Sequence, residues 1–139
     1  MEMNTRRDFL KDVLAGITIV GFMPGILTSC GSDDGSGTIT VDVSSLDAEG
    51  KGLRSTLPDG TPIMVIRRPS NVYVTVQLIC THQGCKGTNL AITGQKIQCG
   101  CHGSEYDLNG KVTKGPATAD LKSYATSFDA AKNEVTITF

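Results

Sequence analysis

The cysteine and histidine side chains of this 139-residue chain are concentrated in two short stretches, which we call the first and second box. The first box reads CTHQGC at residues 80–85, and the second reads CGCHGS at residues 99–104. Together they contain both histidines and four of the five cysteines. Thiolates and imidazoles are the ligands that zinc and iron–sulfur clusters take in proteins. The sequence therefore predicts a metal centre to which both boxes contribute.

Spacing alone leaves the identity of the metal open. The first box offers Cys-x-His and the second offers Cys-x-x-His, which is enough for a tetrahedral zinc site with two cysteines and two histidines. Each box also has a further cysteine, Cys85 or Cys101, that such a zinc site does not need. The extra pair favours the alternative, an iron–sulfur cluster with mixed cysteine and histidine ligands.

The chain on either side of the boxes reads as a series of strands. Alternating polarity and β-branched runs predict strands at residues 38–43, 62–67, 72–79, 111–116, 121–129 and 134–139. The second and third of these predict a hairpin that delivers Cys80 at its end. Residues 44–59 contain several turn signals and predict a loop. Because no long helical period follows residue 37, the predicted fold class of the folded domain is all-β.

The first 29 residues predict an export signal. They contain TRRDFLK at residues 5–11, followed by an apolar run at residues 13–27. The first of these segments resembles a twin-arginine signal. The pathway that reads such signals exports folded domains, so a cluster assembled in the cytoplasm would be preserved. The apolar run is shorter than the ~20 residues of a typical membrane-spanning helix. We therefore expect an N-terminal signal or anchor helix at residues 1–29.

The fifth cysteine, Cys30, follows directly on this signal. The sequence LTSC at residues 27–30 resembles a bacterial lipobox, which implies cleavage before Cys30 and lipidation of its thiol. An uncleaved anchor that happens to end in cysteine is the alternative. Residues 30–37 are rich in glycine, serine and aspartate and predict a flexible tether to a domain at residues 38–139. We expect an exported protein anchored on the periplasmic or extracytoplasmic side of a membrane, with the outer membrane or cell surface as alternative destinations.

The boxes resemble those of Rieske iron–sulfur proteins, whose usual forms are CTHLGC and CPCHGS. This chain departs from those forms at Gln83 and Gly100. The resemblance implies a Rieske-type fold of stacked antiparallel sheets with an inserted cluster-binding subdomain, here at about residues 79–117. It also implies a disulfide between Cys85 and Cys101, as in the cytochrome bc type of Rieske protein. Such a bond is consistent with an oxidising compartment.

The same resemblance implies a [2Fe–2S] cluster, with Cys80 and Cys99 on one iron and His82 and His102 on the other. Two neutral imidazoles leave the oxidised cluster without net charge, which favours reduction and places the potential between about −150 and +300 mV. In high-potential relatives, the residues that match Ser104 and Tyr106 donate hydrogen bonds to a bridging sulfide and to a ligand cysteine sulfur. We therefore expect a potential in the upper half of that range.

These features predict a one-electron carrier that takes electrons from a quinol-oxidising cytochrome b-type subunit and passes them to a cytochrome c-type acceptor. An alternative is the small subunit of an exported molybdenum oxidoreductase such as arsenite oxidase, bound to a large molybdopterin subunit. A structural zinc or redox-sensing module is a third possibility. A net charge of −1 and the lack of a basic stripe argue against nucleic acid as a partner. With no nucleophile and base in a recognisable motif, the chain is expected to act as an electron-transfer subunit and not as a catalyst alone.

Overall fold

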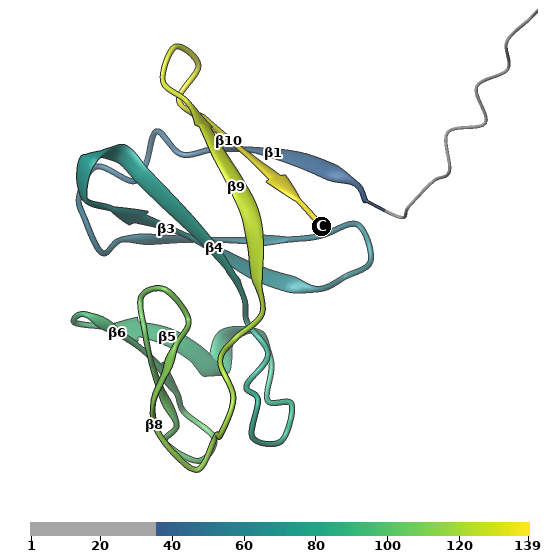
Figure 1. Ribbon diagram of the computed structural model, residues 1–139, viewed down its shortest axis with the longest axis vertical. Helices are drawn as coiled ribbons and strands as arrows, with labels where there is room; N and C mark the ends of the chain where they lie inside the picture. The colour runs from purple at the N-terminus through teal and green to yellow at the C-terminus, as the bar shows by residue number, and fades with distance from the viewer. Residues whose placement is uncertain (1–35) are drawn as a thin grey trace, which may run out of the picture. The chain divides into compact units, whose positions relative to one another are not determined.

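The computed structural model describes residues 36–139. This part of the chain forms two antiparallel sheets and two short 3-10 helices, η1 (Pro69–Asn71) and η2 (Gly87–Asn89), and no α-helix (Figure 1). The larger sheet has six strands, which lie in the order β1 (Thr38–Asp42), β10 (Glu134–Thr138), β9 (Ser123–Asp129), β4 (Val72–Gln77), β3 (Pro62–Arg68) and β2 (Gly52–Thr56). The smaller sheet has four, in the order β5 (Leu90–Thr93), β6 (Lys96–Cys99), β7 (Glu105–Asp107) and β8 (Val112–Lys114).

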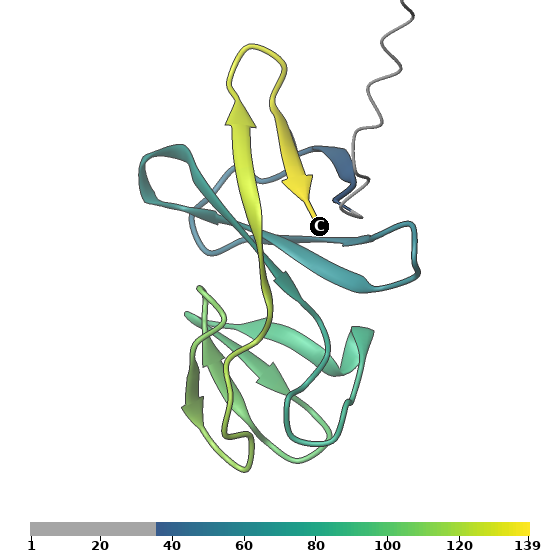
Figure 2. The same ribbon diagram turned by 45° about the vertical axis from the view of Figure 1, so that its right-hand side comes forward.

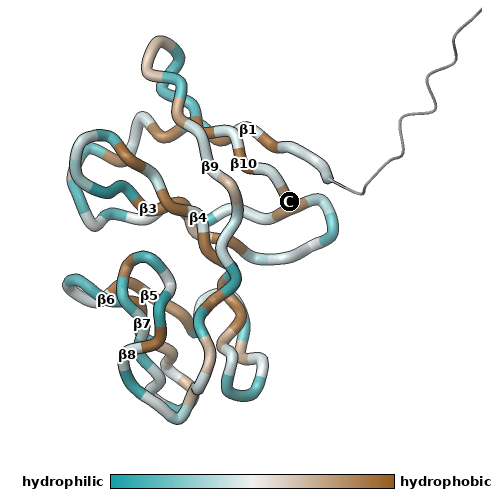
Figure 3. Tube along the Cα trace, viewed as in Figure 1, coloured by the Kyte–Doolittle hydropathy of each residue, from teal (hydrophilic) through white to brown (hydrophobic). Residues whose placement is uncertain are grey.

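The middle of the larger sheet is buried on both faces. β3 reads PIMVIRR, and successive side chains of a strand point to opposite faces of a sheet. Met64 and Ile66 pack in a core shared with the smaller sheet, whereas Ile63 and Val65 pack in a second core on the other face. Hydrophobic segments accordingly follow β3 and β4 in Figure 3. Burial on both faces fixes β4, the strand that leads into the first box.

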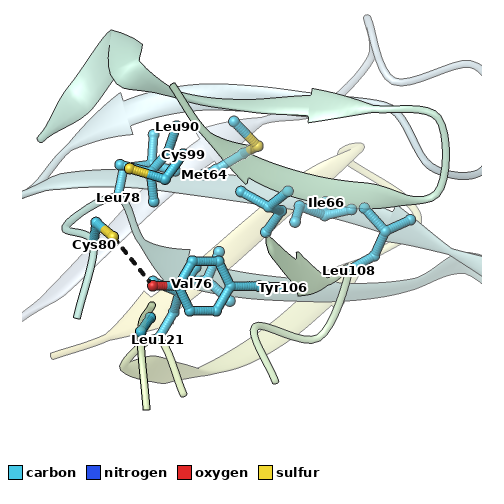
Figure 4. Packing of buried hydrophobic residues seen from close by; sticks show 12 residues of the cluster. Met64, Ile66, Val76, Leu78, Cys80, Leu90, Cys99, Tyr106, Leu108 and Leu121 are labelled. Carbon is cyan, nitrogen blue, oxygen red and sulfur yellow. Dashed lines mark hydrogen bonds between the residues drawn. The ribbon is translucent and has the colours of Figure 1, made fainter. Parts of the chain in front are cut away.

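The core between the two sheets reaches the boxes themselves. It includes Leu90, Ile97 and Tyr106 of the smaller sheet, all with no exposed surface. Cys80 and Cys99 belong to the same core, and Figure 4 shows Cys99 beside Leu90 and Cys80 facing Tyr106. Full burial of a large apolar side chain contributes about 1.5–3 kcal/mol to stability. The packing that joins the sheets therefore also holds one cysteine of each box.

The all-β fold of stacked antiparallel sheets is confirmed. The predicted hairpin is present as β3 and β4, which pair from Ile63 opposite Gln77 to Arg68 opposite Val72. The predicted strands before and after it correspond to β1, β8, β9 and β10, with ends that differ by a few residues.

The loop predicted at residues 44–59 is wrong in part, because β2 lies within it and pairs with β3 along its length. Its sequence, GLRST, has only one large apolar residue, so pairing with β3 and not local patterning makes it a strand. β5, β6 and β7 were not predicted, since the boxes interrupt the patterns around them.

The signal peptide, Cys30 and most of the predicted tether lie outside the described residues. Within residues 36–139, no helix has the length and apolar character that crossing a membrane requires.

Candidate metal centre

Three loops meet at the end of the smaller sheet that lies away from β10. The first box follows β4, the second box connects β6 to β7, and residues 115–120 follow β8. Figures 1 and 2 show these segments together at the lower end of the molecule in both views. We call residues 115–120 the third loop. It carries no cysteine or histidine, yet it contacts both boxes, as described below.

Backbone hydrogen bonds bend the first box into a tight turn. The N–H of Cys80 donates to the carbonyl of Cys85 at 2.8 Å, and the N–H of Gly84 donates to the carbonyl of Cys80 at 2.9 Å. Gly84 has a φ of +70°, a backbone conformation that costs other residues about 1–2 kcal/mol. The turn therefore needs glycine at this position and leaves the Cys80 side chain pointing into the core.

The second box repeats this turn with the same spacing. The N–H of Cys99 donates to the carbonyl of Ser104 at 2.8 Å, and the N–H of Gly103 donates to the carbonyl of Cys99 at 3.0 Å. Gly103 has a φ of +78°, as the equivalent position of the first box requires. The two boxes are thus alike in backbone, and each buries its first cysteine as a free thiol.

The second cysteine of each box joins the two turns. Cys85 and Cys101 form a disulfide, with 6.7 Å between their Cα atoms. The sulfur of Cys99 lies within 4.8 Å of both sulfurs of this bond. The disulfide that the resemblance implied is therefore present, and it holds the second box against the first.

The histidines come together on the outer side of the turns. The ring centroids of His82 and His102 are 4.9 Å apart, and the rings meet edge to face at 87°. His102 is exposed, whereas His82 is half-buried, and its Nδ1 atom is buried without a hydrogen-bond partner. A buried polar atom without a partner costs about 1–3 kcal/mol. A metal ion on this nitrogen would satisfy it, so the observation fits the donor set of a metal centre.

Tyr106 and the Cys80 sulfur form a buried polar contact within the centre. The tyrosine hydroxyl lies 3.3 Å from the Cys80 sulfur, as the dashed line in Figure 4 shows. Burial raises the pKa of Tyr106, and its hydrogen bond to Cys80 raises that pKa further. The pKa of Cys80 is lowered, although burial acts to raise it, because hydrogen bonds from Tyr106 and from the His82 backbone outweigh burial. These two directions favour donation from the Tyr106 hydroxyl to the Cys80 sulfur.

The third loop contacts the hydroxyl groups of both boxes. The backbone N–H of Ala117 donates to the Ser104 hydroxyl at 3.0 Å, and both groups are buried. The Thr81 hydroxyl donates to the carbonyl of Ala119 at 2.6 Å and lies 3.0 Å from the Tyr106 hydroxyl. The sequence singled out Ser104 and Tyr106 but missed Thr81, whose hydroxyl within the first box was the available signal. The two alanines act through backbone atoms, for which residue type gives no signal.

Charged side chains take no part in the centre. The ion pairs between described residues involve Lys51, Lys96, Lys114 and Lys132, and none includes a residue of either box. Two cysteines bound to a metal as thiolates in this buried site would therefore have no ion-paired cation from residues 36–139 to balance them. Two ferric ions, two sulfides, two thiolates and two neutral imidazoles sum to zero charge, so a Rieske cluster fits these residues without a counter-ion.

Comparisons of sequence agree with this chemistry. The profile of the Rieske [2Fe–2S] domain matches residues 38–125. The chain is 40% identical over 63 residues to the cytochrome b6-f complex iron-sulfur subunit of Desmonostoc sp., a match that covers 45% of this chain and 35% of that protein. It is 44% identical over 54 residues to the mitochondrial cytochrome b-c1 complex Rieske subunit of Saccharomyces cerevisiae, covering 39% of this chain and 25% of that protein. The matched stretch is thus about a third or less of these relatives.

Comparisons of structure agree with the fold. The crystal structure of the cyanobacterial plasma membrane Rieske protein PetC3 from Synechocystis superposes with a TM-score of 0.61 and 33% identity, over 71% of this chain and 97% of that one. A chain of the oxygenase–ferredoxin complex of carbazole 1,9a-dioxygenase has the same fold at 21% identity and a TM-score of 0.58, over 72% of this chain and 91% of that one. With the profile match over most of its described residues, the chain belongs to the Rieske [2Fe–2S] domain family.

Proposed function

We propose that the protein is a high-potential, one-electron carrier in which Cys80 and Cys99 bind one iron and His82 and His102 bind the other. The single observation that carries this assignment is that the two boxes place two buried free thiols in one core, while the first box also holds a buried histidine nitrogen without a hydrogen-bond partner. The family supplies the [2Fe–2S] cluster, and these are the side chains that fit it.

The cluster, when bound, accepts and returns one electron. The protein's own groups make reduction favourable. The imidazoles of His82 and His102 contribute no negative charge, unlike the thiolates that would replace them in an all-cysteine site. The Tyr106 hydroxyl lies 3.3 Å from the Cys80 sulfur and can donate to it, and the Ser104 hydroxyl, which accepts from the Ala117 N–H, keeps its own proton free for a sulfur. Hydrogen bonds of this kind strengthen when the negative charge on sulfur increases. Exposed His102 gives electrons a short path to a partner at the surface.

For the partners, we propose a quinol-oxidising cytochrome b-type subunit as donor and a cytochrome c-type protein as acceptor. Support comes from the relatives in sequence, which are subunits of cytochrome b6-f and b-c1 complexes. Gln83 is exposed beside His82 where the family usually has an apolar residue, which makes this docking surface more polar than usual. A large molybdopterin subunit remains the competing partner.

Affinity purification of the tagged full chain from detergent-solubilised membranes of its native host tests this proposal. We expect a haem-containing cytochrome b subunit to co-purify, and we expect quinol to reduce the iron–sulfur centre in that preparation. A molybdopterin subunit in its place, with no reduction by quinol, would contradict the proposed partners while leaving the cluster assignment intact.

Export and anchoring are also part of the proposed function. We expect the mature chain to begin at Cys30 with a lipid on its thiol, which intact mass spectrometry of the membrane-extracted protein would detect. Cys30→Ala should release the domain from the membrane or block processing. A mature mass that includes residues 1–29 would instead show an uncleaved anchor.

A further inference from the structure

The hydroxyl of Thr81 lies between Tyr106 and the third loop. It donates to the Ala119 carbonyl at 2.6 Å and lies 3.0 Å from the Tyr106 hydroxyl. The backbone N–H of Thr81 also donates to the Tyr106 hydroxyl, at 3.2 Å. Tyr106 in turn lies 3.3 Å from the Cys80 sulfur. Five polar groups therefore take part in this network, and only two of them are hydroxyls that can donate or accept.

The number of protons decides the direction of every bond in this group. A carbonyl oxygen carries no proton, so the bond between Thr81 and Ala119 uses the one proton of the Thr81 hydroxyl. In its contact with Tyr106, Thr81 must then accept. Tyr106 has one hydroxyl proton as well, and a Cys80 thiolate can only accept. Thr81 and Cys80 are thus two acceptors for a single tyrosine proton.

The distances favour sharing of that proton and not exclusive donation to sulfur. The Thr81 oxygen lies at 3.0 Å and the Cys80 sulfur at 3.3 Å from the Tyr106 oxygen. Tyr106 is fully buried, so water does not supply another donor or acceptor to its hydroxyl. To the extent that the Tyr106 proton is donated to Thr81, its hydrogen bond to the Cys80 sulfur is weaker.

Ser104 provides the contrasting case within the same centre. Its hydroxyl accepts from the backbone N–H of Ala117, which leaves the serine proton free to point toward sulfur. The third loop thus offers a donor to Ser104 and an acceptor to Thr81. These two backbone groups have opposite effects on the number of protons that reach the cluster.

We infer that Thr81, held by the Ala119 carbonyl, withdraws the Tyr106 hydrogen bond from the Cys80 sulfur and thereby lowers the reduction potential of the centre. Thr81 is a positioning residue, because it acts through Tyr106 and not on the cluster itself. This inference rests on the proposed ligation of the cluster by Cys80. It predicts that the potential is held below the value that Tyr106 could otherwise give.

Redox titration of the cluster-loaded protein tests this in a double-mutant cycle of Thr81→Val and Tyr106→Phe. We expect Thr81→Val to shift the midpoint potential upward when Tyr106 is present. In the Tyr106→Phe background, the upward shift should disappear, leaving only the effect of freeing the third loop. Thr81→Ser, which keeps the hydroxyl, is the matched control and should leave the midpoint close to that of the unaltered protein.

Two further readouts keep the outcome decisive. Thr81→Ala removes the same hydroxyl with less bulk and must shift the midpoint in the same direction as Thr81→Val. Electron–nuclear double resonance in H2O and D2O should show stronger coupling of the exchangeable tyrosine proton in either variant. Equal shifts with and without Tyr106, or a downward shift that needs Tyr106, would overturn the inference. If the unaltered protein showed no Rieske spectrum, the proposed function itself would be refuted.

Discussion

At Tyr106, a single hydroxyl group links the hydrophobic core to the chemistry of the centre. The side chain has no exposed surface, and its oxygen lies 3.3 Å from the sulfur of Cys80. A hydrogen bond to sulfur favours the reduced state, because reduction adds negative charge that the proton partly balances. The effect of this one bond on the potential can therefore be measured separately from ligation.

Tyr106→Phe removes the hydroxyl and keeps the ring that fills the core. A bond worth about 1 kcal/mol more in the reduced state corresponds to a midpoint about 40 mV lower without it. Redox titration measures this shift. Tyr124→Phe is the control, because Tyr124 is also a buried tyrosine but belongs to the other core, and its midpoint should not change. A midpoint unchanged by Tyr106→Phe would remove Tyr106 from the redox centre.

Residue types predict the centre well where side chains do the chemistry. Both boxes, the disulfide pair and Tyr106 lie where the sequence and its family resemblance suggested. Ala117 and Ala119 could not be predicted, since they contribute a backbone N–H and a carbonyl that every residue has. Their position depends on how the third loop folds against the boxes, which is a tertiary property.

At the scale of elements, two similar turns are linked by one covalent bond. The disulfide between Cys85 and Cys101 closes a loop with a sequence separation of 16. Replacing both cysteines by alanine should lower the free energy of unfolding by about 3 kcal/mol, because the unfolded chain regains the entropy of the open loop. Urea unfolding followed by circular dichroism measures this difference. Dithiothreitol should destabilise the unaltered protein and not the double variant; the same response in both would argue against the bond.

The edge strand β2 has a role that its sequence did not reveal. Arg54 on this strand donates from Nη1 to the Gly87 carbonyl at 2.9 Å and from Nη2 to the Leu90 carbonyl. Both carbonyls belong to the segment that follows the first box. Local patterning predicts neither the strand nor the contact, because both depend on the pairing with β3 and on the position of the smaller sheet.

Arg54→Met should therefore loosen the smaller sheet from the larger one. Loss of these charged hydrogen bonds at a largely exposed site should lower the free energy of unfolding by about 1 kcal/mol. Hydrogen exchange should rise locally in η2 and β5, which mass spectrometry can resolve. Arg68→Met is the matched control, because the Arg68 side chain makes no hydrogen bond or ion pair within residues 36–139. Equal effects of the two substitutions would mean that the Arg54 contact contributes nothing.

At the scale of the whole molecule, two hydrophobic cores stabilise the fold of residues 36–139. The smaller sheet is additionally linked by Glu105, which pairs with Lys96 at 2.8 Å and Lys114 at 3.4 Å. The hydrogen bond from Lys96 is the main cause that lowers the pKa of Glu105, and Lys114 adds to it. One carboxylate thereby connects β6, β7 and β8.

This lowered pKa gives stability a defined pH dependence. The ion pairs contribute fully above the pKa of glutamate in the unfolded chain, about 4.3, and their contribution is lost as pH falls through the lower folded-state value. Melting temperatures between about pH 6 and 3 should fall less steeply for Glu105→Gln than for the unaltered protein. Glu49→Gln, at an exposed glutamate without an ion pair among the described residues, should leave the slope unchanged. If melting temperature fell equally steeply with pH in Glu105→Gln and in the unaltered protein, ionisation of Glu105 would not contribute to stability.

The proposed electron transfer depends on a [2Fe–2S] cluster that two cysteines and two histidines bind. A redox titration of the purified holoprotein, monitored by electron paramagnetic resonance, tests it most directly. We expect a reduced [2Fe–2S] signal with a midpoint above zero, in the upper half of the range from about −150 to +300 mV. A cluster with a midpoint potential of about −400 mV, as in all-cysteine plant-type ferredoxins, would contradict histidine ligation. Stoichiometric zinc with no such signal would contradict the cluster itself.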